Sequence, residues 1–477
     1  MSARAVRLIA AAAILILIGV TALLGSSATP SKAAVFEAET GILAGTTVER
    51  SAEGYSGSGY VTGFEADSDA VAVTVQAPQR SLYLVTVGYR SPSGDKAAEL
   101  LLDGRPFGQL QLKRTERFAE ASAGKMLLDK GEHVVQFKRG WGYYDIDYVK
   151  LEATKAVKKH EVTSRLSNPE ATAEAKALMS YLTQVYGKRI LSGQQELDNV
   201  DWIEKLTGRK PAVVGFDLMD YSPSRAERGA SSYEIDKALG WHRQGGIVAF
   251  VWHWNAPKGL IDEPGKEWWR GFYTDAVAFD LDYALKHPDS EDYALLLRDI
   301  DAIGEKLSVL REERVPVLFR PLHEAEGGWF WWGAKGPGPA KELFRIVYDR
   351  LTNGHKLNNL IWVWNSEDPE WYPGDDVVDI VSVDSYPAAG DHNPVSGRYD
   401  NLVRLVGDKK LVALTENGSI PDPDLIFEYG AHWSWFSTWT GEFLTDGVHN
   451  DQSFLQRVYS HPKVITLDEL PDLYAGR

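Results

Sequence analysis

The chain has 477 residues, 44% hydrophobic and 25% charged, a composition that predicts a folded protein of two or three domains and excludes a disordered or fibrous chain. Its formal net charge of −16 disfavours nucleic acid and anionic lipid as partners and suits an uncharged polysaccharide. The absence of cysteine excludes disulfides and a lipid anchor on cysteine.

The N-terminal segment has the order of a secretory signal. Arg4 and Arg7 precede an apolar run at 8–24, and small residues follow up to Ala33. We therefore expect residues 1–33 to be a signal peptide cleaved after Ala33, which predicts a secreted, extracellular protein with no membrane contact after cleavage. The alternative is that the segment is retained as a membrane anchor. The cleaved chain would carry 48 basic and 67 acidic residues.

Residues 34–153 have the pattern of an all-β unit. Short alternating runs at 70–75, 82–89, 99–102 and 133–137 are separated by glycine-containing turns. Strands and turns at this spacing are typical of a β-sandwich. The charged stretch at 154–161, with Lys155, Lys158 and Lys159, is interpreted as a linker.

From residue 162 to 477 the pattern changes to helices alternating with apolar strands. A helix is predicted at 168–186, and a long insertion rich in Trp, Pro and Gly at 254–290 follows the third strand and is expected to form part of a cleft wall. Eight parallel strands in about 300 residues favour an α/β fold of the (β/α)8 TIM-barrel type. The predicted strands are 190–194, 212–217, 247–253, 315–324, 360–365, 380–384, 411–416 and 431–436.

Catalytic side chains of such barrels lie at the carboxyl ends of the strands. The residues at these ends are Gln194, Asp217, His253, Glu324, Asn365, Asp384, Tyr386, Glu416 and Trp435. The set contains two glutamates but no cluster of Cys or His that could hold a catalytic zinc, and the chain has neither a nucleophile elbow nor a phosphate loop.

Two carboxyl groups facing one bond are what glycoside hydrolysis needs, without a catalytic cofactor. Glu324 and Glu416 follow the fourth and seventh apolar runs, so both can point into the barrel mouth. Glu324 would be the protonated acid, favoured by apolar neighbours such as Trp329, and Glu416 the ionised nucleophile, favoured by donors from Tyr386 or Arg320. Each glutamate could instead be a solvated surface charge, and Glu326 is a rival to Glu324.

Aromatic side chains are concentrated around these positions. Of 16 tryptophans, 13 lie between Trp252 and Trp439. Pyranose rings pack on flat aromatic faces, although core packing explains Trp362 and about half of the others. Three Trp and one Phe at 329–332, next to two glycines, cannot all belong to a core.

These segments resemble glycoside hydrolase family 26, in which endo-β-1,4-mannanase is the common activity. The resemblance covers about 160–470 and rests on Gly193–Gln195, Gly215–Asp217 with Asp220 and Tyr221, Trp252–Trp254, Arg320–Gly333, Asp384–Tyr386 and Thr415–Asn417. It implies a TIM-type barrel with Glu324 as acid/base and Glu416 as nucleophile. It places His323 beside the acid/base and implies that His253, Trp329, Tyr386 and Trp435 line the subsites near the cut. The family often has Asn where this chain has Glu326.

The N-terminal unit resembles carbohydrate-binding modules of family 35. The matching segments are Phe36–Glu39, Gly54–Tyr60 and Gly140–Tyr148. The resemblance implies a structural calcium held by Glu37, Glu39 and Asp147, and a sugar platform made by Tyr60 and Trp141. Judged from the residues alone, Glu37 and Glu39 could be solvated charges.

The sequence therefore predicts a secreted, retaining endo-β-1,4-mannanase whose partner is β-mannan polysaccharide, with a monomer as the default state. Some relatives act on mixed-linkage β-glucan or xylan, so an endo-glucanase or xylanase of the same family is an alternative. A non-catalytic polysaccharide-binding protein and a cell-surface scaffold also compete with this prediction. The paired glutamates argue against the binding protein, and the absence of repeats or anchoring motifs argues against the scaffold.

Overall fold

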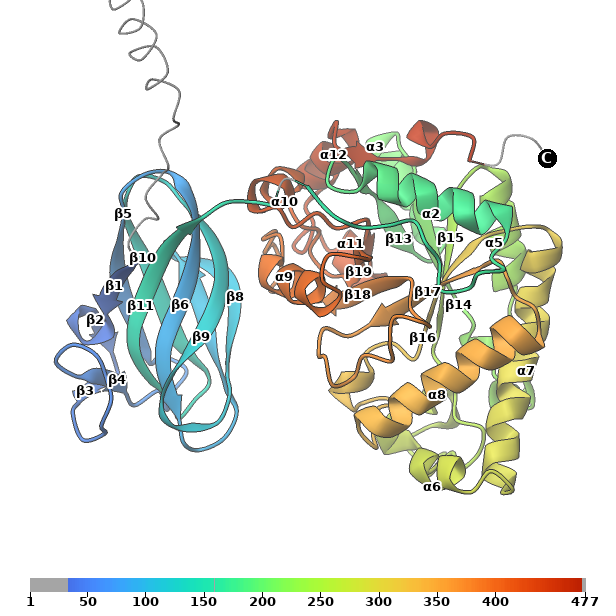
Figure 1. Ribbon diagram of the computed structural model, residues 1–477, viewed down its shortest axis with the longest axis horizontal. Helices are drawn as coiled ribbons and strands as arrows, with labels where there is room; N and C mark the ends of the chain where they lie inside the picture. The colour runs from blue at the N-terminus through green and yellow to red at the C-terminus, as the bar shows by residue number, and fades with distance from the viewer. Residues whose placement is uncertain (1–32, 158, 474–477) are drawn as a thin grey trace, which may run out of the picture.

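The computed structural model describes residues 33–157 and 159–473, which form an all-β module followed by a barrel (Figure 1). Apart from Ala33, the predicted signal peptide lies outside the described residues. Within the described residues, no helix combines the length and the apolarity needed to cross a bilayer.

The module contains two antiparallel sheets, as the sequence predicted. One sheet has the strand order β3-β4-β11-β6-β9, with β1 also paired to β11, and the other has the order β2-β5-β10-β7-β8. The strands are β1 Ala34–Glu37, β2 Ile42–Ala44, β3 Thr47–Glu49, β4 Tyr60–Thr62, β5 Ala70–Ala77, β6 Ser81–Ser91, β7 Lys96–Leu102, β8 Arg105–Leu112, β9 Thr115–Leu128, β10 Gly131–Trp141 and β11 Asp145–Thr154.

Alternating side chains fill the space between the two sheets. In β5 the alternate residues Val71, Val73 and Val75 are buried. Thr74 and Gln76, which point to the other face, are exposed. This period of two is what a sheet with one buried face requires. Pairing of β1 with β11 places Glu37 opposite Tyr148, so acids from the first and last strands become neighbours.

The second part is a closed barrel of eight parallel strands in sequence order, which confirms the predicted fold. The strands are β13 Gly193–Gln195, β14 Val213–Asp217, β15 Ile247–Trp252, β16 Val317–Pro321, β17 Leu360–Asn365, β18 Ile380–Ser385, β19 Leu411–Asn417 and β20 Phe436–Thr438. A separate parallel pair, β12 Ile190–Leu191 and β21 Val464–Ile465, lies outside the closed ring.

Helices cover the outside of the barrel (Figure 1). Thr172 caps the first of them by accepting a hydrogen bond from the Ala175 amide, so this helix starts five residues later than predicted. The helices are α2 Ala173–Val185, α3 Asp198–Thr207, α4 Pro223–Ala226, α5 Glu234–Arg243, α6 Leu281–Lys286, α7 Glu291–Glu312, α8 Pro337–Asp349, α9 Ser396–Leu405, α10 Pro423–Tyr429, α11 Glu442–Thr445 and α12 Gln452–Ser460.

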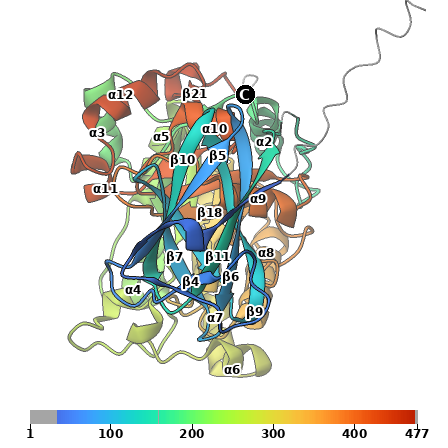
Figure 2. The same cartoon turned by 90° about the vertical axis from the view of Figure 1, so that its left-hand side faces the viewer.

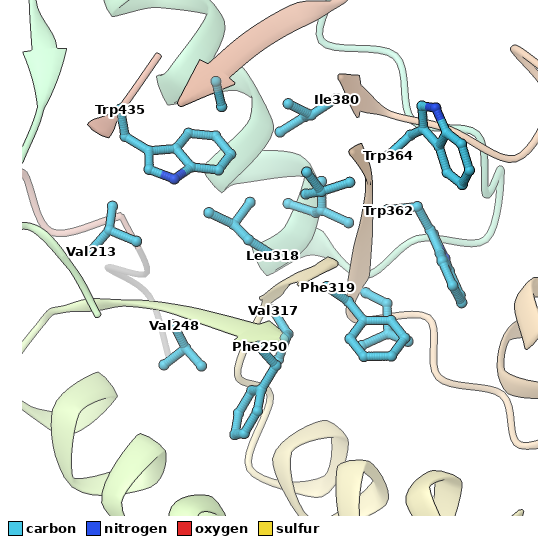
Figure 3. Close-up of a cluster of buried hydrophobic side chains, with 14 of the residues drawn as sticks. Val213, Val248, Phe250, Val317, Leu318, Phe319, Trp362, Trp364, Ile380 and Trp435 are labelled. Carbon is cyan, nitrogen blue, oxygen red and sulfur yellow. The ribbon is translucent and has the colours of Figure 1, made fainter. Parts of the chain in front are cut away.

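The barrel interior is packed rather than open. Val213, Leu318 and Trp435 lie among its buried side chains, and Figure 3 shows Trp362 and Trp364 at another edge of this cluster. The Phe344 ring of α8 contacts both of these tryptophans, which explains their burial and confirms Trp362 as a core residue. Substrate is therefore confined to the rim of the barrel.

The module contacts the barrel domain through strand β9 and helices α9 and α10. Turned by 90°, the protein shows the module in front of the barrel (Figure 2). The Lys125 ammonium donates to Asp400, at 2.9 Å, and to the Tyr429 carbonyl, at 3.1 Å, and the Leu127 amide donates to the Tyr429 hydroxyl at 2.9 Å. The predicted linker is also attached, because His160 bonds Asp408 and His432.

Candidate active site

Glu324 and Glu416 meet at the barrel rim. Glu324 stands just beyond β16, and Glu416 is the sixth residue of β19. Together with Asp384 of β18, each contributes one carboxylate oxygen to a group whose atoms lie within 4.8 Å of one another. Three carboxylates at this spacing repel one another unless positive charge or protons balance them.

The backbone of Glu324 is held in an unusual conformation. Its φ of +51° is left-handed, a region that non-glycine residues rarely adopt and that is found at functional sites. The Glu324 amide donates to the Asn365 side-chain oxygen at 2.8 Å, and the Asn365 amide group donates onward to Thr415 at 3.1 Å and to Ser382 at 3.2 Å. A chain of buried polar groups thus positions this glutamate.

The protonation of Glu324 follows from its surroundings. Burial, together with the charges of Asp384 and Glu416, raises the pKa of Glu324 to about 8. The Trp329 indole donates to the Glu324 carboxylate at 2.9 Å, and this bond lowers the pKa. The predicted desolvation is confirmed as the largest cause of the raised pKa, whereas Trp329 itself lowers the pKa through its hydrogen bond and orients the carboxyl group.

Glu416 receives stronger support for its charged form. One of its oxygens accepts from Arg320, and the other accepts from the Tyr386 hydroxyl at 2.5 Å. Burial and Asp384 raise the pKa of Glu416, while Arg320 and Tyr386 oppose that rise. With two donors on Glu416 and one on Glu324, the ionised form belongs on Glu416 and the proton on Glu324.

Arg320 links Glu416 to a third acid, Asp384, for which the sequence predicted no role. Its second amino group donates to Asp384 at 2.6 Å, and Asp384 also accepts from Thr415 at 2.7 Å. All three side chains are buried. The position of Asp384 at a strand end, two residues before Tyr386, could have indicated a functional residue. Its pairing with Arg320 could not be predicted, because Arg320 lies 64 residues away along the chain.

Two histidines extend this site on the β14 and β15 side. His253 bonds Asp217 through Nδ1 at 2.6 Å, and its Nε2 lies 3.2 Å from Nε2 of the buried His323. Burial lowers the pKa of His323 well below its usual value. Burial also opposes charge on His253, but Asp217 outweighs it and raises the pKa of that ring. The pair therefore holds a proton beside Asp217.

The aromatic block at 329–332 divides into one exposed and three buried rings. Trp329 is 49% exposed, whereas Phe330, Trp331 and Trp332 are at most 4% exposed. The insertion at 254–290 packs on this block, since the Thr274 amide donates to the Trp329 carbonyl at 2.7 Å. The expectation that these rings do not all belong to the core is confirmed: Trp329 stays exposed beside the glutamates, as does Tyr386, which is 42% exposed.

The prediction that Trp435 lines a subsite is wrong. Its side chain is 2% exposed and lies in the barrel core (Figure 3). The reason is the position of the eighth strand, which runs over Phe436–Thr438 rather than 431–436. The residue just past its end is Trp439, whose ring centroid lies 6.2 Å from that of His253. Trp439 was missed because the strand boundary was placed too early.

Glu326 is not a substitute for Glu324. Its carboxylate accepts from the Ser366 hydroxyl, and a guanidinium nitrogen of Arg398 lies 3.9 Å away. It is absent from the close group formed by Glu324, Asp384 and Glu416. The rival assignment on this loop is therefore disfavoured by geometry.

In the module, three predicted calcium ligands gather around the turn at 56–58. The Ser56 amide donates to both oxygens of Asp147 at 3.0 Å, the Ser56 hydroxyl donates to Glu37 at 2.8 Å, and the Ser58 amide donates to Glu39 at 2.6 Å. The second carboxylate oxygens of Glu37 and Glu39 are buried without a hydrogen-bond partner in the described part of the protein. Buried orphan oxygens of this kind fit a cation.

The two predicted platform residues of the module differ in exposure. Trp141 is 64% exposed, with the Lys96 ammonium 4.7 Å from its ring centroid. Tyr60 is 1% exposed, and its ring packs against Tyr55 and Phe118. The predicted role of Tyr60 as an open sugar platform is therefore wrong, because other aromatic rings cover it.

Family models match both parts of the chain. Residues 167–469 match glycosyl hydrolase family 26, and residues 34–154 match carbohydrate binding module family 35. A mannan endo-1,4-β-mannosidase of Thermothelomyces thermophilus is 47% identical over 93% of this chain and 92% of its own length. Mannan endo-1,4-β-mannosidase B of a Piromyces species is 35% identical over 92% of this chain and 78% of its own length.

A solved structure has the same two-part arrangement. It is the β-(1,4)-mannanase of Podospora anserina, described as GH26-CBM35, which is 45% identical, covers 92% of this chain and 99% of its own, and gives a TM-score of 0.69. Glu324 and Glu416 thus lie inside the region matched by the hydrolase family, and the acidic cluster with Trp141 lies inside the region matched by the binding module. The chain belongs to glycosyl hydrolase family 26, and its N-terminal module is a family 35 carbohydrate binding module.

Proposed function

We propose that this protein is a retaining endo-β-1,4-mannanase that hydrolyses mannan, glucomannan or galactomannan by double displacement. The observation that carries the proposal is the close approach of Glu324 and Glu416, with oxygens within 4.8 Å of each other. Retaining enzymes hold their two carboxyl groups about 5–5.5 Å apart, whereas inverting enzymes leave room for a water, at about 6.5–9.5 Å. The choice of mannan rests on the activity named for the relatives.

In the first step Glu416 attacks the anomeric carbon while Glu324 protonates the departing glycosidic oxygen. Arg320 and Tyr386 hold the Glu416 carboxylate ionised and fixed in direction. Attack forms a covalent glycosyl–enzyme bond, and the leaving sugar chain departs with the proton of Glu324. The high pKa of Glu324 ensures that the proton is present at neutral pH.

In the second step the same pair releases the sugar. Glu324, now ionised, takes a proton from a water that attacks the anomeric carbon, and Glu416 leaves as a carboxylate. Two inversions give net retention. Trp329 is placed to support a sugar ring and Glu324 together, because its ring is exposed and its indole NH is bonded to the acid.

The module and the N-terminal segment complete the proposal. Exposed Trp141 supplies a surface for binding polysaccharide, and calcium bound by Glu37, Glu39 and Asp147 would link the first and last strands. The carboxylate oxygens of Glu37, Glu39 and Asp147 are not all within 4.8 Å of one another. Among the described residues, Glu324, Asp384 and Glu416 form the one group of possible metal ligands that meets this distance. The signal-like order of residues 1–33 supports secretion into the extracellular space.

Reducing-sugar release from soluble mannan by wild type and by Glu416→Ala tests the activity. We expect turnover by wild type and its loss in the variant, with mixed-linkage glucan and xylan as comparison substrates. Proton NMR of the first product distinguishes retention from inversion. Equal activity in both proteins would refute the nucleophile assignment, and an α-configured first product would refute the double displacement.

A further inference from the structure

A cleft separates the module from the barrel domain beside the catalytic centre. Its volume is about 850 Å³, within the usual range of ligand pockets. One wall comes from β7, β8, β9 and β10 of the module, and the other comes from the segment at 385–401, which follows β18 and enters α9. Figure 1 shows β8 and β9 on the side of the module that faces the barrel.

Direct bonds hold the two walls in place. The side-chain amide of Asn393 donates to the Pro106 carbonyl at 3.1 Å, which joins the 385–401 segment to β8. Lys125 of β9 is 6% exposed and pairs with Asp400 of α9. This ion pair stabilises the interface, because separating the domains would break it and leave a charge unpaired. The cleft is therefore a formed feature of the protein, not a gap between loosely tethered domains.

Strand β8 contributes neutral hydrogen-bonding groups to the module wall, which also contains Glu99 of β7 and Lys138 of β10, two residues of opposite charge that face each other across these strands. Leu110 and Leu112 of β8 are buried in the sandwich, so the alternate residues Gln109 and Gln111 face outward and line the cleft. Within the described residues, neither glutamine side chain has a hydrogen-bond partner. Phe107, which is half-buried, adds an aromatic surface on the same strand. Free amides beside an aromatic ring are the groups that bind uncharged, hydroxyl-rich chains.

The opposite wall leads directly to the catalytic pair. Tyr386 lines the cleft, and its hydroxyl donates to Glu416. Arg398 also lines the cleft; it pairs with Glu367 at 2.7 Å and donates to the Asp384 carbonyl. Because the Arg398 guanidinium is already paired with the Glu367 carboxylate, it is not available to bind an anionic ligand.

We propose that this cleft binds the mannan chain as it extends from the catalytic centre, so that strand β8 supplies substrate contacts through Gln109 and Gln111. The inference rests on the proposed mannanase function and deepens it. The module would then act in two ways: Trp141 attaches to polysaccharide at a distance, and β8 extends the groove in which cleavage occurs. Long chains fill this extension, whereas a short substrate reaches only the positions beside Glu324 and Glu416.

The double variant Gln109→Ala/Gln111→Ala tests this. We measure kcat/KM for soluble galactomannan and for an aryl mannobioside, and we compare their ratio with that of wild type. Loss of two hydrogen bonds to the long chain should lower the ratio about tenfold, mainly through KM because binding outside the reacting sugars is lost. Thermal unfolding should be unchanged, since both side chains are exposed.

The matched control is Thr74→Ala/Gln76→Ala, which removes two exposed polar side chains from β5 of the same sheet, outside the cleft. Its ratio should equal that of wild type. An unchanged ratio in Gln109→Ala/Gln111→Ala, with wild type active on galactomannan, would overturn the extended groove and leave the mannanase proposal standing. Wild type inactive on every mannan would instead overturn the proposed function, and the extended groove with it.

Discussion

A carboxylate oxygen of Glu324 lies within 4.8 Å of one of Glu416, although 92 residues separate them along the chain. Their strands, β16 and β19, are not neighbours in the barrel, so the contact exists only because the sheet closes. Closure of the barrel therefore brings the two acids, which stand at the carboxyl ends of their strands, together at the barrel mouth. Their unequal hydrogen bonding then favours opposite protonation states.

Glu324→Gln should separate proton donation from nucleophilic attack. The amide cannot protonate a leaving group, so hydrolysis of mannan should fall about 100- to 10,000-fold, while an aryl glycoside with a good leaving group should lose far less in its first step. The matched control is Glu326→Gln on the same loop, which should retain mannan hydrolysis because its carboxylate is bonded to Ser366 instead. The opposite pattern between these two variants would transfer the acid role to Glu326.

The pH profile should report the raised pKa of Glu324. Activity requires Glu324 protonated, so kcat/KM should persist through neutral pH and decline as pH rises through about 8. Asp384→Asn removes a negative charge that raises the pKa of both Glu324 and Glu416. Both limbs of the profile should therefore move to lower pH. A basic limb that stays in place in Asp384→Asn would show that another group controls it.

Tyr386→Phe should weaken the nucleophile without removing the ring. Loss of the hydroxyl takes one donor from Glu416, which costs about 1.5–3 kcal/mol for a hydrogen bond to a charged group and thus about ten- to a hundredfold in kcat/KM. Because that donor lowers the pKa of Glu416, the acidic limb should move to higher pH. Tyr372→Phe is the control: its hydroxyl bonds Asp375, so its kinetics should match wild type.

Much of this site could be predicted because its signals are local. An apolar run ending in a polar residue identifies a barrel strand, and the predicted run at 360–365 agrees residue for residue with β17. The same rule located Glu324 and Glu416. It failed at Trp435, because the apolar run ends at Phe436 whereas the strand continues to Thr438. Trp435 forms a bridge to Leu191 just before the strand and is buried, so the strand end lies two residues later than the run suggested.

Other features could not be predicted because their partners are distant in sequence. The resemblance to family 35 modules implied that Tyr60 is an open sugar platform, but Phe118 of another strand covers its ring. The Lys125–Asp400 pair joins residues 275 positions apart. No local pattern distinguishes such a lysine from a solvated one, and the interdomain cleft depends on contacts of this kind.

Calcium should stabilise the module through its orphan carboxylate oxygens. After chelation with EDTA, added calcium should raise the unfolding temperature, and at a hundredfold excess over Kd the gain is about 2.7 kcal/mol. Glu37→Gln/Glu39→Gln should abolish the shift, since neutral amides are weaker ligands. Glu116→Gln, an exposed acid of the same module, should keep it. A calcium shift that survives in Glu37→Gln/Glu39→Gln would place the ion elsewhere.

Lys125→Met should loosen the interface between the domains while leaving each core intact. The substitution removes the ammonium that bonds Asp400 and the Tyr429 carbonyl and leaves that carboxylate partly buried and unpaired. Removing one partner of a fully buried pair costs about 3–5 kcal/mol. Because Asp400 retains some solvent contact, we expect Lys125→Met to lower the unfolding free energy by about 1–3 kcal/mol. This loss lies between those typical of exposed and of fully buried ion pairs. Calorimetry should show the module and the barrel unfolding in more widely separated transitions.

Lys113→Met, which breaks an exposed pair with Asp95 inside the module, should change the unfolding free energy by less than about 1 kcal/mol. Identical calorimetric traces for Lys125→Met and wild type would show that this contact does not hold the two domains together.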